Sequence, residues 1–183
     1  MWSVAGKVFT TLLVVALALA ALAAWSIVQH GVSARDKPTA VEGAIAGVLR
    51  HAAVPRTARA MKNPIKLDSV VLAEGREHWA DHCASCHGMT GKGDTEIGRG
   101  LYPKPPDMSD GSPDLSDGEL FYIITNGVRL TGMPGWGDPR DPHSNEQTWH
   151  LVHFIRHLPK LTPAELEQMR KETMPEDEFL SGK

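Results

Sequence analysis

The chain of 183 residues carries 19 Lys and Arg against 22 Asp and Glu, and 42% of its residues are hydrophobic. This length suits one modest domain with an extension. The formal net charge of −3 excludes the basic surface that nucleic-acid binding requires, so we expect no nucleic-acid partner.

The first predicted element is an apolar segment over residues 8–28, which contains no charged residue. As a helix rising about 1.5 Å per residue it would span a hydrocarbon core of about 30 Å. Trp2 and Trp25 would lie near the two interfaces, where aromatic residues gather. A cleavable signal peptide is the alternative, with Lys7 as its basic segment and 18–20 as a small-residue site. The length of the run favours a retained single-pass transmembrane anchor over residues 1–29.

A connecting segment is predicted for residues 30–66, which contain Pro38, Pro55 and Pro64. Between the first two prolines, apolar residues recur at helical spacing and predict an amphipathic helix of about three turns: Val41, Ala44, Ile45, Val48 and Leu49. We expect this helix to pack on the domain or on a partner, and a position on the membrane surface is the alternative.

A folded domain is predicted from residue 67 to residue 161. Its first helix should begin near Asp68 or Ser69, which both favour the N-cap position. Leu72, Gly75 and Trp79 share one face of this helix. Glycine permits another helix to approach closely, and the indole supplies bulk beside it.

The helix leads directly into Cys83-Ala84-Ser85-Cys86-His87. C-x-x-C-H is the attachment pattern of a c-type haem. Two thiols three positions apart lie about one helical turn from each other, so both can reach the two vinyl groups of a porphyrin, and His87 can bind the iron. A zinc site would lack its second cysteine pair, and a redox dithiol would need a preceding strand. The motif therefore favours haem.

A glycine-rich stretch over residues 88–100 follows the motif. Its spacing fits no phosphate-binding loop, so we interpret it as backbone that passes close to a flat ligand. Prolines crowd residues 103–106, and one of their carbonyls could accept a hydrogen bond from the second ring nitrogen of His87.

Three capping boxes predict further helices that begin at Ser116, Ser144 and Thr162. Gly127 and Pro159 should end the first two. The third opens a terminal segment over residues 162–183, with a peripheral helix and the acidic tail Glu176-Asp177-Glu178. The sequence contains no convincing strand, and the loop over residues 138–143 is not assigned.

A second axial ligand decides whether haem iron carries electrons or binds substrates. A thioether suits ferrous iron and raises its potential. Met133 lies in the segment 131–136, where glycines and a proline favour a tight loop that can project a side chain. Met108 lies in a polar stretch and is the weaker methionine candidate. A distal histidine, His143 or His150, is the alternative.

Together these residues resemble a membrane-anchored class I c-type cytochrome. The matching pieces are Gly75-x-x-x-Trp79, the Cys83–His87 motif, Gly132-Met133-Pro134 and the apolar helix from Trp149 to Leu158. The resemblance implies an all-α cytochrome c-like domain around one covalently bound haem c. It implies thioether links at Cys83 and Cys86, axial ligation by His87 and Met133, and first and last core helices that cross near Gly75.

We therefore expect a single-electron carrier rather than an enzyme, because filled axial positions leave the iron no site for a substrate. It would exchange electrons with a redox donor and acceptor, anchored in the cell inner membrane with its haem domain in the periplasm. The mixed charge around residues 92–107 indicates no docking patch of one sign. Two alternatives are a fixed cytochrome subunit of a larger respiratory or dehydrogenase complex, and a haem enzyme or gas sensor with a labile distal ligand.

Overall fold

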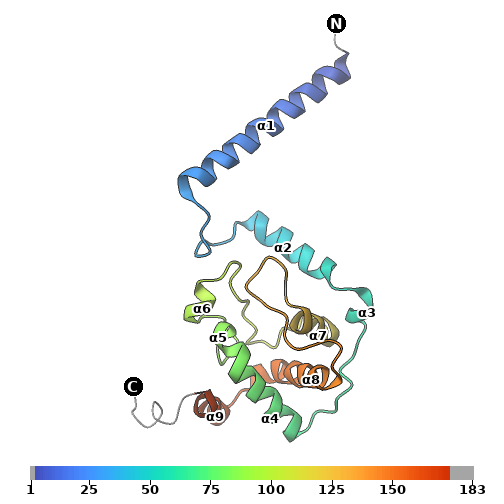
Figure 1. Cartoon of the computed structure of the whole chain (residues 1–183), viewed down its shortest axis with the longest axis vertical. Helices are drawn as coiled ribbons and strands as arrows, with labels where there is room; N and C mark the ends of the chain where they lie inside the picture. Colours follow the sequence, from blue (N-terminus) through green and yellow to red (C-terminus); the bar gives the residue numbers. More distant parts are fainter. Residues whose placement is uncertain (1–2, 174–183) are drawn as a thin grey trace. The chain divides into compact units, whose positions relative to one another are not determined.

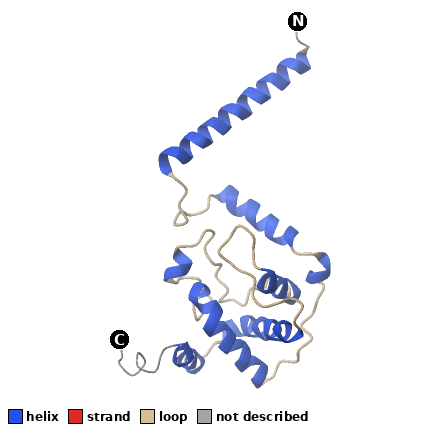
Figure 2. Cartoon of the chain, in the orientation of Figure 1, coloured by secondary structure: helices blue, strands red, loops and turns tan. Residues whose placement is uncertain are grey.

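A computed structural model of the chain describes residues 3–173. Within this range the secondary structure is helical without strands (Figure 2), which confirms the predicted all-α class. The chain divides into two compact units between Asp36 and Lys37. Trp2 and the predicted acidic tail lie outside the described residues.

The first unit holds helix α1 (Val4–His30), which Ser3 caps by accepting a hydrogen bond from the Gly6 N–H at 3.2 Å. None of the side chains of α1 is buried. Among the helices of the described chain, α1 has the length and apolar composition of a membrane span, and a signal sequence near an N-terminus would share both properties. Retention of this segment as an anchor stays a prediction.

The second unit holds the remaining helices (Figure 1). Its elements are α2 (Ala40–Ala53), α3 (Arg56–Arg59), α4 (Ser69–His78), the π-helical segment η1 (Trp79–Cys83), α5 (Ala84–His87), α6 (Glu96–Arg99), α7 (Asp117–Asn126), α8 (Pro142–His157), the 3₁₀ segment η2 (Leu158–Lys160) and α9 (Pro163–Thr173).

The core is built where α4 crosses α8. Asp68 caps α4 by accepting hydrogen bonds from the N–H groups of Val70 and Val71, which confirms the predicted start of this helix. A Cβ at Gly75 would collide with the carbonyl oxygen of His150, so the two helix backbones touch directly. One turn later the ring centroid of Trp79 lies 5.9 Å from that of Phe154. The crossing near Gly75 that the resemblance implied is therefore present.

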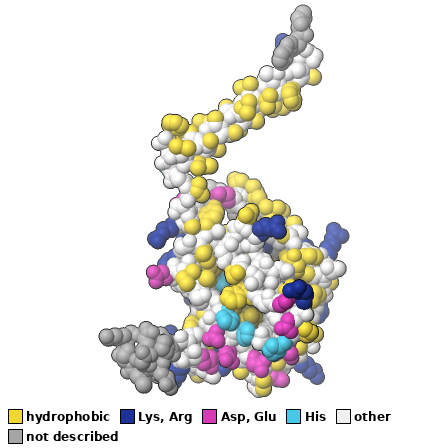
Figure 3. All heavy atoms as spheres, in the orientation of Figure 1, with side chains coloured by type: hydrophobic (Ala, Val, Ile, Leu, Met, Phe, Trp, Pro, Cys, Tyr) yellow, Lys and Arg dark blue, Asp and Glu magenta, His cyan; other side chains and the backbone are white. Residues whose placement is uncertain are grey.

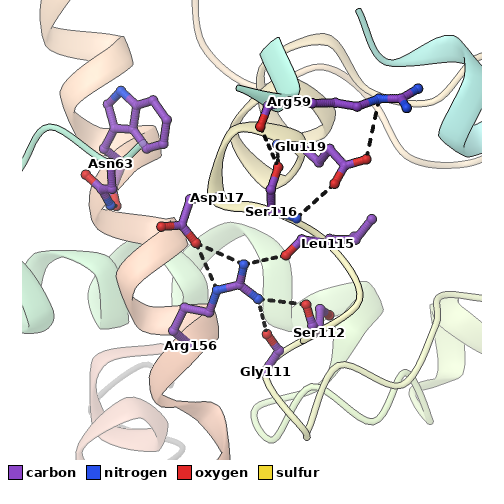
Figure 4. A network of polar contacts seen from close by, with 10 residues as sticks. Arg59, Asn63, Gly111, Ser112, Leu115, Ser116, Asp117, Glu119 and Arg156 are labelled. Atoms are coloured by element: carbon purple, nitrogen blue, oxygen red, sulfur yellow. Dashed lines mark hydrogen bonds and ion pairs between the residues drawn. The ribbon is translucent and has the colours of Figure 1, made fainter. Parts of the chain in front are cut away.

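Helix α7 is tied to α8 by one arginine (Figure 4). The Arg156 guanidinium donates hydrogen bonds to the carbonyls of Gly111, Ser112 and Leu115 and to the Asp117 carboxylate. Five donors in a fixed plane can satisfy several carbonyls at once. The same loop leads into the Ser116 capping box, which is confirmed, and α7 ends at Gly127 as predicted.

Helix α8 begins earlier than its predicted capping box. Asp141, rather than Ser144, is the N-cap, and Pro142 occupies the first helical position. Proline has no N–H to satisfy there and its fixed φ suits a helix start. Ser144 instead accepts a hydrogen bond from the Asp138 N–H at 3.0 Å. The end of the unassigned 138–143 loop is therefore the first turn of α8.

The capping box of α9 is confirmed, because Thr162 and Glu165 exchange backbone and side-chain hydrogen bonds. The sequence predicts a peripheral helix here, but α9 buries Met169 completely within the core. The Arg76 guanidinium of α4 also lies 3.6 Å from the Glu172 carboxylate. We infer that α9 contributes to the packing of α4.

The predicted connecting segment contacts the domain over its second half. Val54 and Ala58 are buried. The Asn63 side chain donates to the Trp149 carbonyl at 2.9 Å, and a ring nitrogen of His153 lies 2.8 Å from the Ile65 carbonyl. The apolar residues of α2, in contrast, stay exposed, so this face does not pack on the domain as one of our expectations had it.

The Gly75 contact predicts a stability effect with a matched control. Gly75→Ala should lower the free energy of unfolding by about 1–3 kcal/mol, because the added methyl forces two helix backbones apart. Gly43→Ala should instead raise it by about 0.5–1 kcal/mol, since a Cβ there meets nothing within 4 Å and alanine favours a helix. Urea unfolding followed by tryptophan fluorescence measures both, and an unchanged midpoint for Gly75→Ala would contradict the contact.

Candidate haem-binding site

The C-x-x-C-H motif begins at the end of a widened helical turn. Over η1 the helix adopts π geometry, and the Ala84 N–H donates to the Trp79 carbonyl. Cys83 then caps α5, which contains Cys86 and His87. Single π turns within helices are rare and are frequent at functional sites. The sequence carried no signal for this turn, because the same residues suit ordinary α geometry.

The short helix α5 is held by hydrogen bonds to the last carbonyls of the motif. Gly93 N–H donates to the His87 carbonyl at 2.7 Å, and Thr95 Oγ1 donates to the Cys86 carbonyl at 3.1 Å. These bonds satisfy groups that a helix end leaves unpaired. A Cβ at Gly98 would lie 2.7 Å from the Cys86 carbonyl oxygen. Close approach at Gly98 is to the chain's own backbone, and the role of the other glycines beside a flat ligand stays a prediction.

Trp79 connects the helix crossing to His87. Its indole N–H donates to the Gly88 carbonyl at 3.2 Å, and its ring centroid lies 5.8 Å from that of His87. The buried indole therefore fixes both the backbone after His87 and one side of the imidazole. Sequence reasoning assigned Trp79 only bulk and missed this hydrogen bond, since its acceptor is a loop carbonyl.

Burial lowers the pKa of His87 and so favours its neutral imidazole, the form that binds a metal. Nδ1 of this ring is buried and has no hydrogen-bond partner among the described residues. The expected bond to a carbonyl within 103–106 is therefore not formed. A buried nitrogen without a protein partner is costly. The neutral imidazole that burial favours agrees with a haem ligand, whereas the expected support of its second nitrogen is absent among the described residues.

The Cys83 thiol is unsuited to thiolate chemistry. Burial, and then the neighbouring Cys86, raises the pKa of Cys83 to about 12. A redox dithiol or a zinc ligand acts as the thiolate. Across the part of the chain that the structure describes, no three His, Cys, Asp or Glu side chains are arranged to hold a metal ion. These observations disfavour both alternatives to haem.

Met133 lies in a loop fastened to the end of α7. Gly127 has a φ of +68°, and a Cβ on it would lie 2.5 Å from the Gly135 nitrogen. The Val128 N–H donates to the Met133 carbonyl at 3.0 Å, and the Trp136 N–H donates to the Ile124 carbonyl at 2.9 Å. The loop over residues 128–136 is thus fixed by its backbone, and the Met133 side chain is half-buried.

The loop and the motif meet at a cavity of about 140 Å³. Cys83 and His82 line it from the motif side, and Trp136 lines it from the Met133 loop. The His82 and Trp136 rings stack with centroids 5.1 Å apart. Met108 instead belongs to the hydrophobic core, and its N–H donates to the Gly91 carbonyl.

Neither of the two candidate distal histidines lines this first cavity. His143 and His150 line a second cavity of about 390 Å³, formed by α4, η1 and α8. His150 is buried, with Nδ1 2.8 Å from a carboxylate oxygen of Glu74.

Four acidic residues surround this second cavity: Glu74, Glu77, Asp81 and Glu146. Histidine and acidic side chains gather on one face in Figure 3. Sequence reasoning did not identify this acidic cluster, because α4 and α8 are far apart in the sequence.

Comparisons with known proteins agree with this geometry. The family model described as cytochrome C oxidase, cbb3-type, subunit III matches residues 71–155. The match contains most of α4, the haem motif, the Met133 loop and most of α8. Over residues 71–155 the chain therefore resembles a class I c-type cytochrome domain, a kind of domain that binds haem and carries electrons.

A curated relative extends the comparison. The chain is 32% identical over 97 residues to the cbb3-type cytochrome c oxidase subunit FixP of Azorhizobium caulinodans. The aligned residues are 48% of this chain and 28% of that protein. The chain therefore matches less than a third of the relative's length.

One solved structure was also similar. It is the reducing HAO-like protein complex of Kuenenia stuttgartiensis, with a TM-score of 0.44 and 22% identity over 52% of this chain and 46% of that one. A likeness of this size supports no functional argument.

The backbone of the Met133 loop predicts a second mutational effect. Gly127→Ala should cost about 1–3 kcal/mol of folding free energy, because a left-handed φ and a backbone collision both oppose the methyl. The displaced loop should also alter the haem absorption spectrum. Gly100→Ala is the control, since Gly100 has a negative φ and its nearest neighbour would lie 3.3 Å away. Equal spectra and unfolding midpoints for the two variants would contradict the loop's role.

Proposed function

We propose that this chain is a single-electron carrier with one covalently bound haem c. Cys83 and Cys86 would form the thioether links, and His87 and Met133 would be the axial ligands. The supporting observation is the cavity at which Cys83 of the motif meets Trp136 of the Met133 loop. His143 and His150 line a different cavity among acidic side chains, and His150 Nδ1 already lies 2.8 Å from the Glu74 carboxylate, which supports Met133 over either histidine.

The main role of the protein would be to hold the two axial ligands in fixed positions. The haem, when bound, supplies the one-electron change between ferric and ferrous iron. His87 keeps a neutral imidazole because burial lowers its pKa. Met133 sits on a loop fixed by main-chain hydrogen bonds. Ligands held in both oxidation states require little rearrangement, which suits electron transfer. Ile97 of α6 and Leu130 of the Met133 loop are 54% and 94% exposed, and such apolar side chains would suit contact with a porphyrin.

Location and partners follow from the first unit and the relative. Helix α1 would anchor the protein as a single pass in the inner membrane, with the haem domain in the periplasm. A redox donor and a redox acceptor would be its partners. A fixed cytochrome subunit of a larger respiratory or dehydrogenase complex is a second candidate, because the relative FixP is an oxidase subunit. Purification in mild detergent separates the two: a subunit retains catalytic partners in fixed ratio, whereas a free carrier elutes alone.

The axial assignment is tested by a pair of methionine variants. Met133→Ala should lower the reduction potential by on the order of 0.1 V or more, since axial ligands set haem potentials over about 0.8 V. It should also abolish the iron–methionine charge-transfer band and let carbon monoxide bind the reduced protein rapidly. Met108→Ala should retain the band and lose only stability, because Met108 is buried core. The reverse pattern would move the ligand to Met108, and rapid carbon monoxide binding to the unmutated protein would favour the gas-sensor alternative.

The covalent links are tested at the second cysteine. Cys86→Ala should abolish or badly impair haem attachment, because one of two thioethers is lost. Ser85→Ala is the matched control, since Ser85 lies between the cysteines and is exposed. Haem staining after denaturing electrophoresis, with the pyridine haemochrome spectrum, measures attachment. An intact two-link spectrum for Cys86→Ala would contradict the assignment.

A further inference from the structure

Helix α2 presents its apolar face to the outside of the domain. Four large apolar side chains are 55–70% exposed: Val41, Ile45, Val48 and Leu49. At 3.6 residues per turn they lie along one stripe of the helix. Figure 3 shows hydrophobic side chains over the region of α2 in Figure 1. An exposed apolar stripe of this length is uncommon on a soluble surface and marks an interaction site.

The opposite side of α2 faces the domain. Arg50 is half-buried, with its guanidinium 3.8 Å from the Asp114 carboxylate. Glu42 accepts a hydrogen bond from the Tyr102 side chain. Gly47, on the same side as Arg50, is also partly covered. Polar contacts therefore orient the helix with its apolar stripe outward, which is the reverse of an ordinary surface helix.

Local signals at both ends stabilise α2 as a helix. Thr39 and Glu42 form a complete capping box, with the Thr39 N–H 2.7 Å from the Glu42 carboxylate. Prolines flank the helix at positions 38 and 55. A helix with such end signals keeps its stripe intact when nothing covers it.

The charge around α2 and the short segment that joins it to α1 indicate what covers the apolar stripe. Residues 35–62 carry six basic side chains and two acidic ones, whereas acidic residues outnumber basic ones in the chain from residue 63 onward. Arg50 and Arg59 face Asp114 and Glu119 of the domain, which leaves Arg35, Lys37, Arg56 and Lys62 as the basic side chains nearest the stripe in sequence. Only residues 31–39 separate α1 from α2, and a fully extended chain of that length reaches roughly 30 Å. A helix tethered so closely to a membrane span, with basic neighbours, meets an anionic bilayer at high local concentration.

We propose that α2 lies on the surface of an anionic lipid bilayer, with Val41, Ile45, Val48 and Leu49 inserted at the level of the headgroups. This inference rests on the proposed anchoring by α1 and is independent of the haem ligands. The contact would give the cytochrome domain a defined orientation on the membrane. A flexible nine-residue tether alone would leave that orientation free.

The test compares two single cysteines on opposite faces of α2. The haem-loaded full chain is placed, one copy per disc, in nanodiscs of phosphatidylcholine and phosphatidylglycerol. Ile45→Cys lies in the stripe, and Gly43→Cys lies opposite, where a side chain meets nothing within 4 Å. A water-soluble maleimide should label Ile45→Cys about tenfold more slowly than Gly43→Cys, because a thiol at headgroup depth is shielded from water.

Equal labelling rates in the nanodiscs would overturn the proposal. Protection of Ile45→Cys in native membranes but not in nanodiscs would overturn it too, since a protein partner would then cover the stripe. If the chain does not incorporate into nanodiscs, then α1 is not a membrane anchor, and the proposal that rests on it is overturned. The haem absorption spectrum of the same samples reports separately on the proposed electron carrier, so failure of either claim is recognised without the other.

Discussion

The backbones of α4 and α8 touch at Gly75, where the carbonyl of His150 occupies the space that any side chain would need. This contact sets the direction in which α4 leaves the crossing. Trp79 follows one turn later, packs against Phe154, and donates its indole N–H to the backbone directly after His87. The position of the haem motif is therefore linked to the helix crossing through one buried side chain.

Both proposed axial ligands lie on segments that the backbone holds in place. His87 ends a four-residue helix whose last carbonyls accept hydrogen bonds from the following loop. Met133 lies in a loop whose N–H and carbonyl groups pair with the end of α7. Helix α7 is in turn tied to α8 by Arg156. Ligands fixed in this way change little when the iron changes charge, which lowers the reorganisation that electron transfer requires.

The charges of the second unit are distributed unevenly. Acidic side chains surround the cavity formed by α4, η1 and α8, whereas basic side chains precede and follow α2. A bilayer with anionic lipids would attract the α2 side and repel the acidic one. The uneven charge thus agrees with a domain whose α2 side meets the membrane.

The sequence by itself determined the elements that depend on neighbouring residues. The Asp68 N-cap, the capping boxes at Ser116 and Thr162, and the C-x-x-C-H motif are local patterns, so each could be predicted without a fold. It could not show the π turn at Trp79, the start of α8 at Pro142, or the outward stripe of α2. These depend on which groups from distant segments satisfy each backbone and side chain. Only the tertiary structure decided that Cys83 and Trp136 of the Met133 loop border one cavity while His150 borders another, because that choice depends on how α4, α7 and α8 pack.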